Sequence, residues 1–273
     1  MEFPGKVVIV TGGASGIGLE TVKSFGREGA SVMIADIAAD GENIARKLQQ
    51  QGLNVRFRKT DVCSEQDQQA LIIDTLNVFS RLDIVFANAG IARDGAVEDL
   101  LFSDWQKTID INLSGVFLSN KYAIQHWLAH QQVGIIVNCG SIHSFVGKRH
   151  VTAYAAAKGG VKLLTETLAA DYAGKNIRIN AICPGYIDTP LLKKLTQQQK
   201  NDLLRLHPQG RLGRPAELAN AVLFLAGSVS SFINGASLLV DGGYPAQYQL
   251  FFEPLMKNRP LLLVVSDRTF QLL

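Results

Sequence analysis

Tyr154 and Lys158 are the two residues whose types and spacing most directly suggest chemistry. They lie four apart in an alanine-rich segment that predicts a helix, and residues at that spacing share one helical face. A phenol is a weak base near neutral pH because its unperturbed pKa is about 10, and a neighbouring ammonium favours the phenolate. Two unit charges about 4 Å apart at an effective dielectric of roughly 20 interact by about 4 kcal/mol, enough to lower that pKa to roughly 7. The pair could therefore act as an acid/base group in a cleft, whereas on a solvated surface the same spacing has no such meaning.

Seven short apolar segments alternate with amphipathic ones and predict the elements that would hold this pair. Strands are expected at residues 6–10, 31–35, 54–58, 83–87, 134–139, 177–183 and 236–240. Helices are expected at residues 19–29, 41–51, 64–80, 103–130 (long or interrupted), 153–173 and 215–226. Such alternation is typical of a parallel sheet covered on both faces. We therefore expect one α/β domain over residues 1–243, a Rossmann-type doubly wound parallel sheet of seven strands with helices on both faces.

A glycine-rich turn, Thr11-Gly-Gly-Ala-Ser-Gly-Ile-Gly18, follows the first expected strand and leads into a helix. Backbone N–H groups at such a turn can bind a phosphate, although the glycines do not have the G-x-G-x-x-G spacing and could be plain turn formers. The second strand ends at Asp36, 18 residues beyond Gly18, where a carboxylate can bind both ribose hydroxyls of an adenosine. The same carboxylate would repel a 2′-phosphate, and Ile37 offers no cation to bind one. The sequence therefore favours NAD over NADP.

Further short motifs follow the later strands, at the edge where open α/β sheets bind ligands, although each is also ordinary turn chemistry. They are Asp61-Val62, Asn88-Ala-Gly90, Asn112, Ser141, Tyr154-x-x-x-Lys158, Pro184-Gly185 with Thr189, and Asp241-Gly-Gly243. In this order, over residues 5–243, they make the chain resemble the short-chain dehydrogenase/reductase (SDR) family, in its compact single-domain branch. The family's glycine turn has the spacing seen here. Ala87 departs from the family, in which a second Asn often precedes the Asn-Ala-Gly motif.

The resemblance implies a Ser-Tyr-Lys-Asn acid/base system. Tyr154 would exchange a proton with the substrate oxygen, and Lys158 would lower the tyrosine pKa and bind the nicotinamide ribose. Ser141 would hold the substrate oxygen; Ser144 is a competitor, but the 13-residue offset of Ser141 from Tyr154 suits the family better. Asn112 would position a water that relays protons to Lys158. Its residue type alone is also compatible with a buried helix asparagine bonded to the backbone.

The resemblance also implies where cofactor and substrate bind. The expected cofactor-binding residues are Gly12, Ser15, Gly16, Ile17, Gly18, Asp36, Asp61, Val62, Asn88, Ala89, Gly90, Tyr154, Lys158, Pro184, Gly185, Ile187 and Thr189. The expected substrate residues are Ser141, His143 and Tyr154. His143 lies where the family's substrate pockets often have a lining residue, and the alternative is a polar loop residue.

We therefore expect an NAD-dependent oxidoreductase that interconverts a small secondary alcohol and its ketone by hydride transfer. One alternative is a non-catalytic NAD-sensing or scaffold protein on the same fold, against which the intact Ser-Tyr-Lys set argues. Another is an epimerase or dehydratase of the family's larger branches, which carry a further substrate domain; only 115 residues follow Lys158 here. A sugar, a hydroxy acid and a cyclic ketone all remain open as substrates.

Composition argues against other classes of protein. A formal net charge of +3 without a block of like charges does not suggest a nucleic-acid surface. No apolar run is long enough to span a membrane, and no signal-peptide pattern begins the chain. Three distant cysteines among apolar residues favour reduced, buried thiols and a cytoplasmic location. The pair His126/His130 has metal-ligand spacing but no nearby acid, so no metal is expected.

Two segments lie outside the core motifs. Residues 186–213 predict a substrate lid, with Leu191, Leu192, Leu195 and Leu203 as its apolar inner face or as ordinary helix packing. Residues 244–273 extend beyond the usual end of the family and contain Pro245, Pro254, Pro260 and the apolar run 261–265. We expect this extension to pack on its own domain or on a partner subunit, the alternative being disorder. The resemblance also implies a homo-oligomer, either a tetramer built on the long helices or a dimer.

Overall fold

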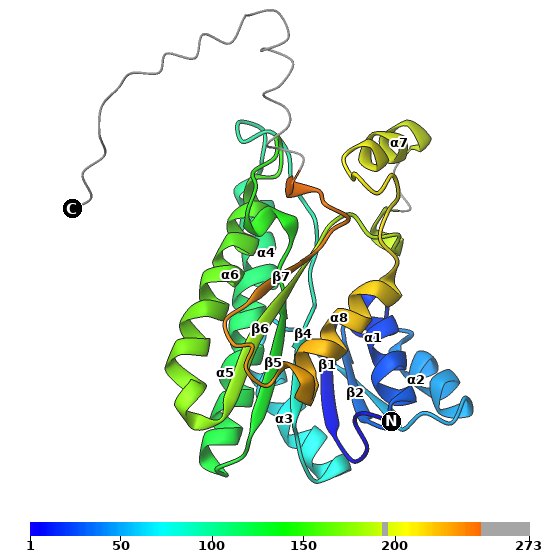
Figure 1. Ribbon diagram of the computed structural model, residues 1–273, viewed down its shortest axis with the longest axis vertical. Coiled ribbons are helices and arrows are strands. Elements are labelled where there is room, and N and C mark those ends of the chain that lie inside the picture. The colour runs from blue at the N-terminus through cyan, green and yellow to red at the C-terminus, as the bar shows by residue number, and fades with distance from the viewer. Residues whose placement is uncertain (193–195, 247–273) are drawn as a thin grey trace, which may run out of the picture.

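The computed structural model describes residues 1–192 and 196–246, and within them a sheet of seven parallel strands in the order β3-β2-β1-β4-β5-β6-β7 (Figure 1). The order reverses between β1 and β4, which makes their carboxyl ends the topological switch point where open α/β sheets bind ligands. This confirms the expected Rossmann-type fold. The strands are β1 (Val7–Thr11), β2 (Ser31–Asp36), β3 (Val55–Lys59), β4 (Ile84–Ala87), β5 (Gly134–Cys139), β6 (Ile177–Pro184) and β7 (Ser237–Val240).

Helices cover both faces of the sheet because successive side chains of a strand point to opposite sides. Val8 and Val10 of β1 pack in one buried cluster with α1, α2 and α8, whereas Ile9 packs in a second cluster with α3, α5 and α6. Both faces are thus apolar, which explains why β1 is buried at every position. The helices are α1 (Gly16–Arg27), α2 (Gly41–Gln50), α3 (Glu65–Phe79), α4 (Phe102–Ile109), α5 (Gly115–Ala129), α6 (Thr152–Tyr172), α7 (Gln197–Arg205) and α8 (Pro215–Ala226).

The helix expected over residues 103–130 consists of three segments. A π-helical turn, Asp110–Ser114, separates α4 from α5. Single π-turns inside helices often occur at functional sites, and this one contains Asn112. The other predicted elements have bounds within two or three residues of those observed.

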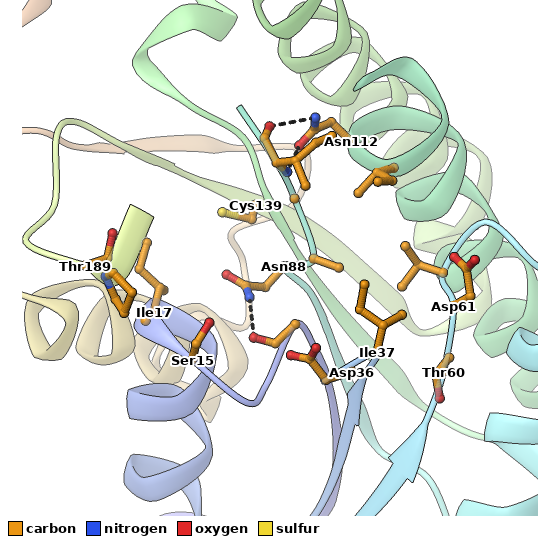
Figure 2. A pocket seen from close by; sticks show the side chains of 18 of the residues that line it. Ser15, Ile17, Asp36, Ile37, Thr60, Asp61, Asn88, Asn112, Cys139 and Thr189 are labelled. Carbon is orange, nitrogen blue, oxygen red and sulfur yellow. Dashed lines mark hydrogen bonds between the residues drawn. The ribbon is translucent and has the colours of Figure 1, made fainter. Parts of the chain in front are cut away.

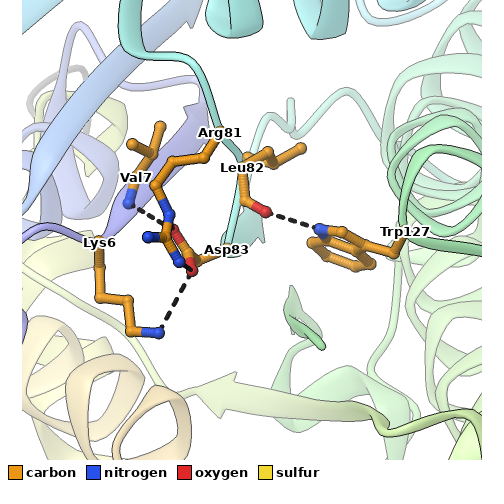
Figure 3. A network of polar contacts seen from close by, with 6 residues as sticks. All are labelled: Lys6, Val7, Arg81, Leu82, Asp83 and Trp127. Carbon is orange, nitrogen blue, oxygen red and sulfur yellow. Dashed lines mark hydrogen bonds and ion pairs between the residues drawn. The ribbon is translucent and has the colours of Figure 1, made fainter. Parts of the chain in front are cut away.

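A polar cluster at the amino ends of β1 and β4 fastens the edge of the sheet opposite the switch point (Figure 3). The Asp83 carboxylate accepts hydrogen bonds from the backbone N–H of Val7 (2.9 Å) and from the Arg81 guanidinium (2.6 and 2.8 Å). Lys6 adds a second cation at 3.3 Å. Nearby, the Trp127 indole N–H donates to the Leu82 carbonyl at 2.8 Å. These bonds fix β4 against β1, and therefore fix the register of the carboxyl ends where the site is formed.

Parts of two sequence predictions fall on residues that the structure does not describe. Leu195 of the expected lid, and Pro254, Pro260 and the run 261–265 of the C-terminal extension, lie outside the described residues. In the described ranges, no helix is long and apolar enough to cross a membrane.

Candidate active site

A cleft of about 380 Å³ lies at the carboxyl ends of β1, β2, β4 and β5 (Figure 2). Most of the residues predicted to bind the cofactor line it, together with residues from α6 and from the segment after β6. Those predicted residues are Gly12, Ser15, Gly16, Ile17, Asp36, Asp61, Val62, Asn88, Ala89, Gly90, Tyr154, Lys158 and Thr189. Sequence reasoning missed six further lining residues, namely Ile37, Thr60, Ile91, Ile111, Cys139 and Pro190.

The glycine turn has no room for side chains at two positions. Gly12 has φ +63°, and a Cβ there would be 2.9 Å from the Asn88 side-chain nitrogen. A Cβ on Gly18 would be 2.2 Å from the Gly12 carbonyl oxygen, so helix α1 can approach the turn only because residue 18 is glycine. Gly18 therefore serves close packing, while Gly12 and the N-cap residue Ser15 face the cleft. The first turn of α1 thus presents its N–H groups to the cleft.

Asn88 joins the two strands that flank the switch point. Its amide nitrogen donates to the Thr11 carbonyl at 2.9 Å and to the Gly12 carbonyl at 3.3 Å, as Figure 2 shows in part. The Thr11 hydroxyl in turn accepts the backbone N–H groups of Asn88 (2.9 Å) and Ala89 (3.1 Å). These four bonds hold the glycine turn against the end of β4, and the floor of the cleft is fixed before any ligand binds.

Asp36, at the end of β2, lines the cleft beside the glycine turn, and its carboxylate is held by backbone N–H groups. One oxygen accepts the N–H of Ala14 and the other the N–H of Ala38, both at 3.0 Å. A carboxylate oxygen has a second lone pair, so both oxygens can still accept a hydroxyl proton. Among the described residues that line the cleft, Lys158 is the only Lys or Arg, so no lining side chain offers a cation near Asp36.

Asn112 lies in the π-helical turn and is fully buried. Its side-chain oxygen accepts the Ile91 N–H at 3.1 Å, and its nitrogen donates to the carbonyls of Ile91 (2.9 Å) and Thr108 (3.0 Å). Gly90 leaves room for this arrangement, since a Cβ there would be 2.6 Å from the Asn112 oxygen. Both N–H donors of the amide are committed to the backbone, which is the alternative that the residue type allowed. The side-chain oxygen keeps a second lone pair that could accept a hydrogen bond from a water, and Asn112 lines the cleft, so its role in positioning a relay water stays a prediction.

Tyr154 and Lys158 lie one turn apart on α6 and both line the cleft. The buried Lys158 ammonium donates to the Cys139 carbonyl at 2.6 Å and is 5.6 Å from the centre of the Tyr154 ring. Burial lowers the pKa of Lys158. Burial also raises the pKa of Tyr154, and hydrogen bonding with Ser141 opposes that rise only in part. Desolvation of the phenolate is the largest effect on this pKa, and the lowering expected from Lys158 stays a prediction.

Ser141 and Ser144 flank a short 3₁₀ turn, Ile142–Ser144, that packs against α6. The Ser144 hydroxyl donates to the Lys158 carbonyl at 2.7 Å and accepts the Ser141 N–H at 3.2 Å. Ser144 is thus committed to joining the turn to the helix. The Ser141 hydroxyl accepts the His143 N–H at 3.1 Å and can still donate toward the Tyr154 side. The geometry favours Ser141 as the group that holds a substrate oxygen.

His143 is buried beside Tyr154. Its ring lies edge-on to that of Tyr154, with 6.2 Å between ring centres, and 6.3 Å from the ring of Tyr186. Burial lowers the pKa of His143. Sequence reasoning missed Tyr186, although it directly follows the predicted Pro184-Gly185 motif. The rings of His143 and Tyr186 therefore form an aromatic cluster beside Tyr154.

Asp94 is another residue that sequence reasoning missed. Its two carboxylate oxygens accept the backbone N–H groups of Ala153 (2.8 Å) and Tyr154 (3.0 Å) at the start of α6. The helix has no side-chain cap of its own, since its N-cap residue is Val151. The absence of a capping residue at the start of α6 indicated that another residue must cap the helix. That residue, Asp94, lies 59 residues away from Ala153 in sequence, so no local pattern identifies it.

Four predicted cofactor contacts lie outside the cleft lining. Gly18 packs against the turn, Pro184 is buried in β6, and Gly185 packs beside His207. Ile187 is buried in the apolar core and forms a bridge with Gly213. The chain after β6 instead reaches the cleft through Thr189 and Pro190.

The remaining sequence expectations concern the lid, the histidines and the cysteines. In the lid, Leu203 of α7 is buried. His130 is exposed and its ring nitrogen lies 2.9 Å from the His126 carbonyl; in the ranges that the structure covers, no cluster could hold a metal ion. Cys139 and Cys183 are buried free thiols as expected, whereas Cys63 is only half-buried.

The sequence and the fold of this chain were compared with those of known proteins, and both have related matches. A family model described as enoyl-(acyl carrier protein) reductase matches residues 12–245. The chain is 42% identical over 245 residues to cis-4-hydroxycyclohexanecarboxylate dehydrogenase of Sinomonas cyclohexanicum, covering 89% of this chain and 98% of that protein. It is 36% identical to cyclohexanol dehydrogenase of Acinetobacter sp. (strain SE19), covering 90% and 97%. The crystal structure of levodione reductase superposes with a TM-score of 0.86 at 31% identity, covering 90% of this chain and all of that one (100%).

Proposed function

Because the chain belongs to the short-chain dehydrogenase/reductase family, whose members use a nicotinamide cofactor, we propose that it is an NAD-dependent dehydrogenase of a small cyclic secondary alcohol. It is an oxidoreductase that acts on CH–OH groups, as its relatives are. The proposal of NAD-dependent alcohol oxidation rests mainly on one cleft, which joins the glycine turn and Asp36 at one end to Tyr154 and Lys158 at the other.

The residues present fit a dinucleotide. Gly12 and Gly16 line the cleft without side chains, and the N-terminus of α1 faces it, as a pyrophosphate requires. Asp36 offers two fixed acceptors for the adenosine ribose, and its negative charge disfavours a 2′-phosphate. Lys158 has two further ammonium protons for the second ribose. Together these features favour NAD over NADP.

The bound nicotinamide would supply the hydride acceptor or donor. In alcohol oxidation Ser141 would hold the substrate oxygen, and Tyr154 would take the hydroxyl proton as a hydride leaves the carbon. Tyr154 must be ionised to do so, and burial opposes this in the present structure. Lys158, held by the Cys139 carbonyl, is the nearest fixed cation to stabilise the phenolate once the cleft is filled. In ketone reduction the same phenol would return the proton.

The proposed substrate is a secondary alcohol on a six-membered ring, or the corresponding ketone. Two relatives that match nearly the whole chain are named for such alcohols. The rings of His143 and Tyr186 beside Tyr154 offer the flat apolar walls that a saturated ring would contact. We further propose a cytoplasmic homo-oligomer, a tetramer or dimer built on α5 and α6, since Phe117 and Leu163 on these helices are exposed apolar side chains.

The test is oxidation of cyclohexanol by the purified protein, followed by the absorbance of the reduced nicotinamide, with NAD and NADP compared. NAD should be preferred, and Tyr154→Phe should abolish turnover while NAD affinity, measured by calorimetry, is nearly unchanged. Turnover by the phenylalanine variant near the wild-type rate would overturn the role of the phenol. NAD binding without oxidation of any alcohol or reduction of any ketone would favour a non-catalytic NAD-sensing or scaffold protein.

A further inference from the structure

Lys148 is a cation beside the substrate side of the site. Its ammonium donates to the Tyr186 hydroxyl at 2.6 Å and lies 4.7 Å from the centre of that ring. In the part of the chain that the structure describes, none of the ion pairs includes Lys148. An ammonium has three N–H donors, so two remain after the bond to Tyr186.

A directed chain of hydrogen bonds connects this ammonium to His143, whose ring lies edge-on to that of Tyr154. His143 Nδ1 lies 3.0 Å from the Val146 carbonyl, which can only accept, so Nδ1 carries the proton of the neutral ring. His143 Nε2 is then an acceptor and lies 3.5 Å from the Tyr186 hydroxyl. The Tyr186 hydroxyl can therefore accept a hydrogen bond from Lys148 and donate its own hydrogen bond to His143. This polarity leaves the positive charge at the Lys148 end.

The backbone of Tyr186 is itself held in place by the side chain of His207. His207 is buried, its Nδ1 lies 2.9 Å from the Leu203 carbonyl, and its Nε2 accepts the Tyr186 N–H at 3.2 Å. The rings of Tyr186 and His207 also pack edge-on, with 5.7 Å between centres. A fixed phenol limits where the flexible lysine side chain can place its charge, and a preset donor costs less entropy when it binds a ligand.

Asp94, an acid in this region, forms no ion pair with Lys148 among the described residues. Asp94 and Lys148 both act electrostatically on His143, but both Asp94 oxygens already accept N–H groups at the start of α6. Arg149 and His150, which follow Lys148, are exposed and add no negative charge. The surroundings of the Lys148 ammonium therefore favour an anion.

We propose that Lys148, positioned by Tyr186, binds a carboxylate on the substrate, remote from the carbon that reacts at Tyr154. The inference rests on the proposed function for the position of the reacting carbon. A single ammonium with two free donors matches one carboxylate, whereas a phosphate site commonly gathers several cations or an arginine fork. The substrate class is thus a ring alcohol, or its ketone, that carries a carboxylate.

The first experiment measures binding without turnover. Calorimetry compares cyclohexanecarboxylate with its uncharged amide, cyclohexanecarboxamide, on the full-length protein with NAD present. The wild-type protein should prefer the carboxylate, and Lys148→Gln should weaken carboxylate binding by about 10- to 100-fold with little effect on the amide. Tyr186→Phe should weaken it less. Arg149→Gln is the matched control, because it removes a charge one residue away that contacts neither tyrosine, and it should leave both ligands unchanged.

The second experiment is kinetic. The ratio of kcat/KM for cis-4-hydroxycyclohexanecarboxylate to that for cyclohexanol should fall in Lys148→Gln by a similar factor, mostly through KM. Equal carboxylate binding by wild type and Lys148→Gln, or an equal loss for the amide, would overturn the carboxylate site. If neither alcohol is oxidised by the wild-type protein, the proposed function fails, and the calorimetric comparison still decides for or against the site.

Discussion

Asp94 supplies the N-terminal cap of α6, and removing it tests whether a remote loop positions the reacting tyrosine. The first four N–H groups of a helix have no partner within the helix. Here Val151 is the N-cap residue and contributes no side-chain bond, so Asp94 is the acceptor for the N–H groups of Ala153 and Tyr154. The carboxylate also places a negative charge at the positive end of the helix dipole.

The expected cost follows from these two contributions. Loss of a capping side chain costs about 0.5–2 kcal/mol, and loss of a charge at a helix N-terminus costs about 0.3–1 kcal/mol. Asp94→Ala should therefore lower the free energy of unfolding by about 2 kcal/mol, which corresponds to a fall in Tm of roughly 4–8 °C for a domain of this size. Asp94→Asn keeps one acceptor oxygen and loses the charge, so about half of that loss is expected.

The assay combines urea unfolding with steady-state kinetics. A positioning role predicts that Asp94→Ala lowers kcat at least tenfold, an estimate of about 1.4 kcal/mol of transition-state stabilisation, while NAD affinity stays near that of wild type. Asp104→Ala is the matched control, since Asp104 forms a partly exposed ion pair with Arg93 on the neighbouring segment. Such pairs contribute about 0–1 kcal/mol. Wild-type stability and kcat in Asp94→Ala would refute the reasoning, and so would equal damage in the Asp104 variant.

Two further predictions concern packing and pH. Gly18→Ala should abolish NAD binding and destabilise the fold by about 1–3 kcal/mol, because its Cβ would be 2.2 Å from the Gly12 carbonyl oxygen. In Gly159→Ala the new Cβ has no atom within 4 Å, so this variant should stabilise α6 by about 0.5–1 kcal/mol. Urea unfolding measures both changes, and the opposite order of stabilities would contradict the packing argument. Burial is the main cause that lowers the pKa values of His143 and His126. For His143, the Val146 carbonyl and Asp94 raise the pKa and Lys148 lowers it. For His126, His130 lowers the pKa further. The unfolded chain therefore binds more protons than the folded chain below about pH 6.5. As the pH is lowered through this range, the free energy of unfolding should decrease by up to about 1.4 kcal/mol per pH unit for each histidine. His143→Asn should show a shallower fall, and an unchanged slope would argue against a neutral buried ring.

The framework of the cofactor side could be predicted from the sequence because local patterns determine it. The β-branched run of β1 is buried on both faces, and the glycines follow at the strand-to-helix turn. Asp36 ends β2 because the polar residue falls where the strand reaches the edge of the sheet. In each case, the signal and the structure lie within a few residues of each other. The parallel sheet of seven strands follows from the same alternation of elements.

The π-helical turn and the pKa of Tyr154 could not be predicted in this way. The turn at Asn112 depends on bonds to Ile91, 21 residues earlier, and no local pattern encodes that partner. The rise in the pKa of Tyr154 depends on how much water the surrounding elements exclude. Spacing gives the distance between two charges on a helix but not the desolvation of either one, and here desolvation is the larger contribution.

The same distinction explains why the cofactor class is easier to infer than the substrate. The fixed polar contacts of Asp36 and Asn88 at the cofactor end involve main-chain groups at or just beyond the carboxyl ends of β1 and β2, whose positions the sheet register dictates. The substrate side is instead built from side chains on separate loops, Lys148 after β5 and Tyr186 after β6, which meet only in the fold. Substituting either residue would leave the sheet and the glycine turn intact. The fold can therefore keep one cofactor site while the two loops change the substrate that it accepts, and substrate specificity should be sought in the contact between Lys148 and Tyr186.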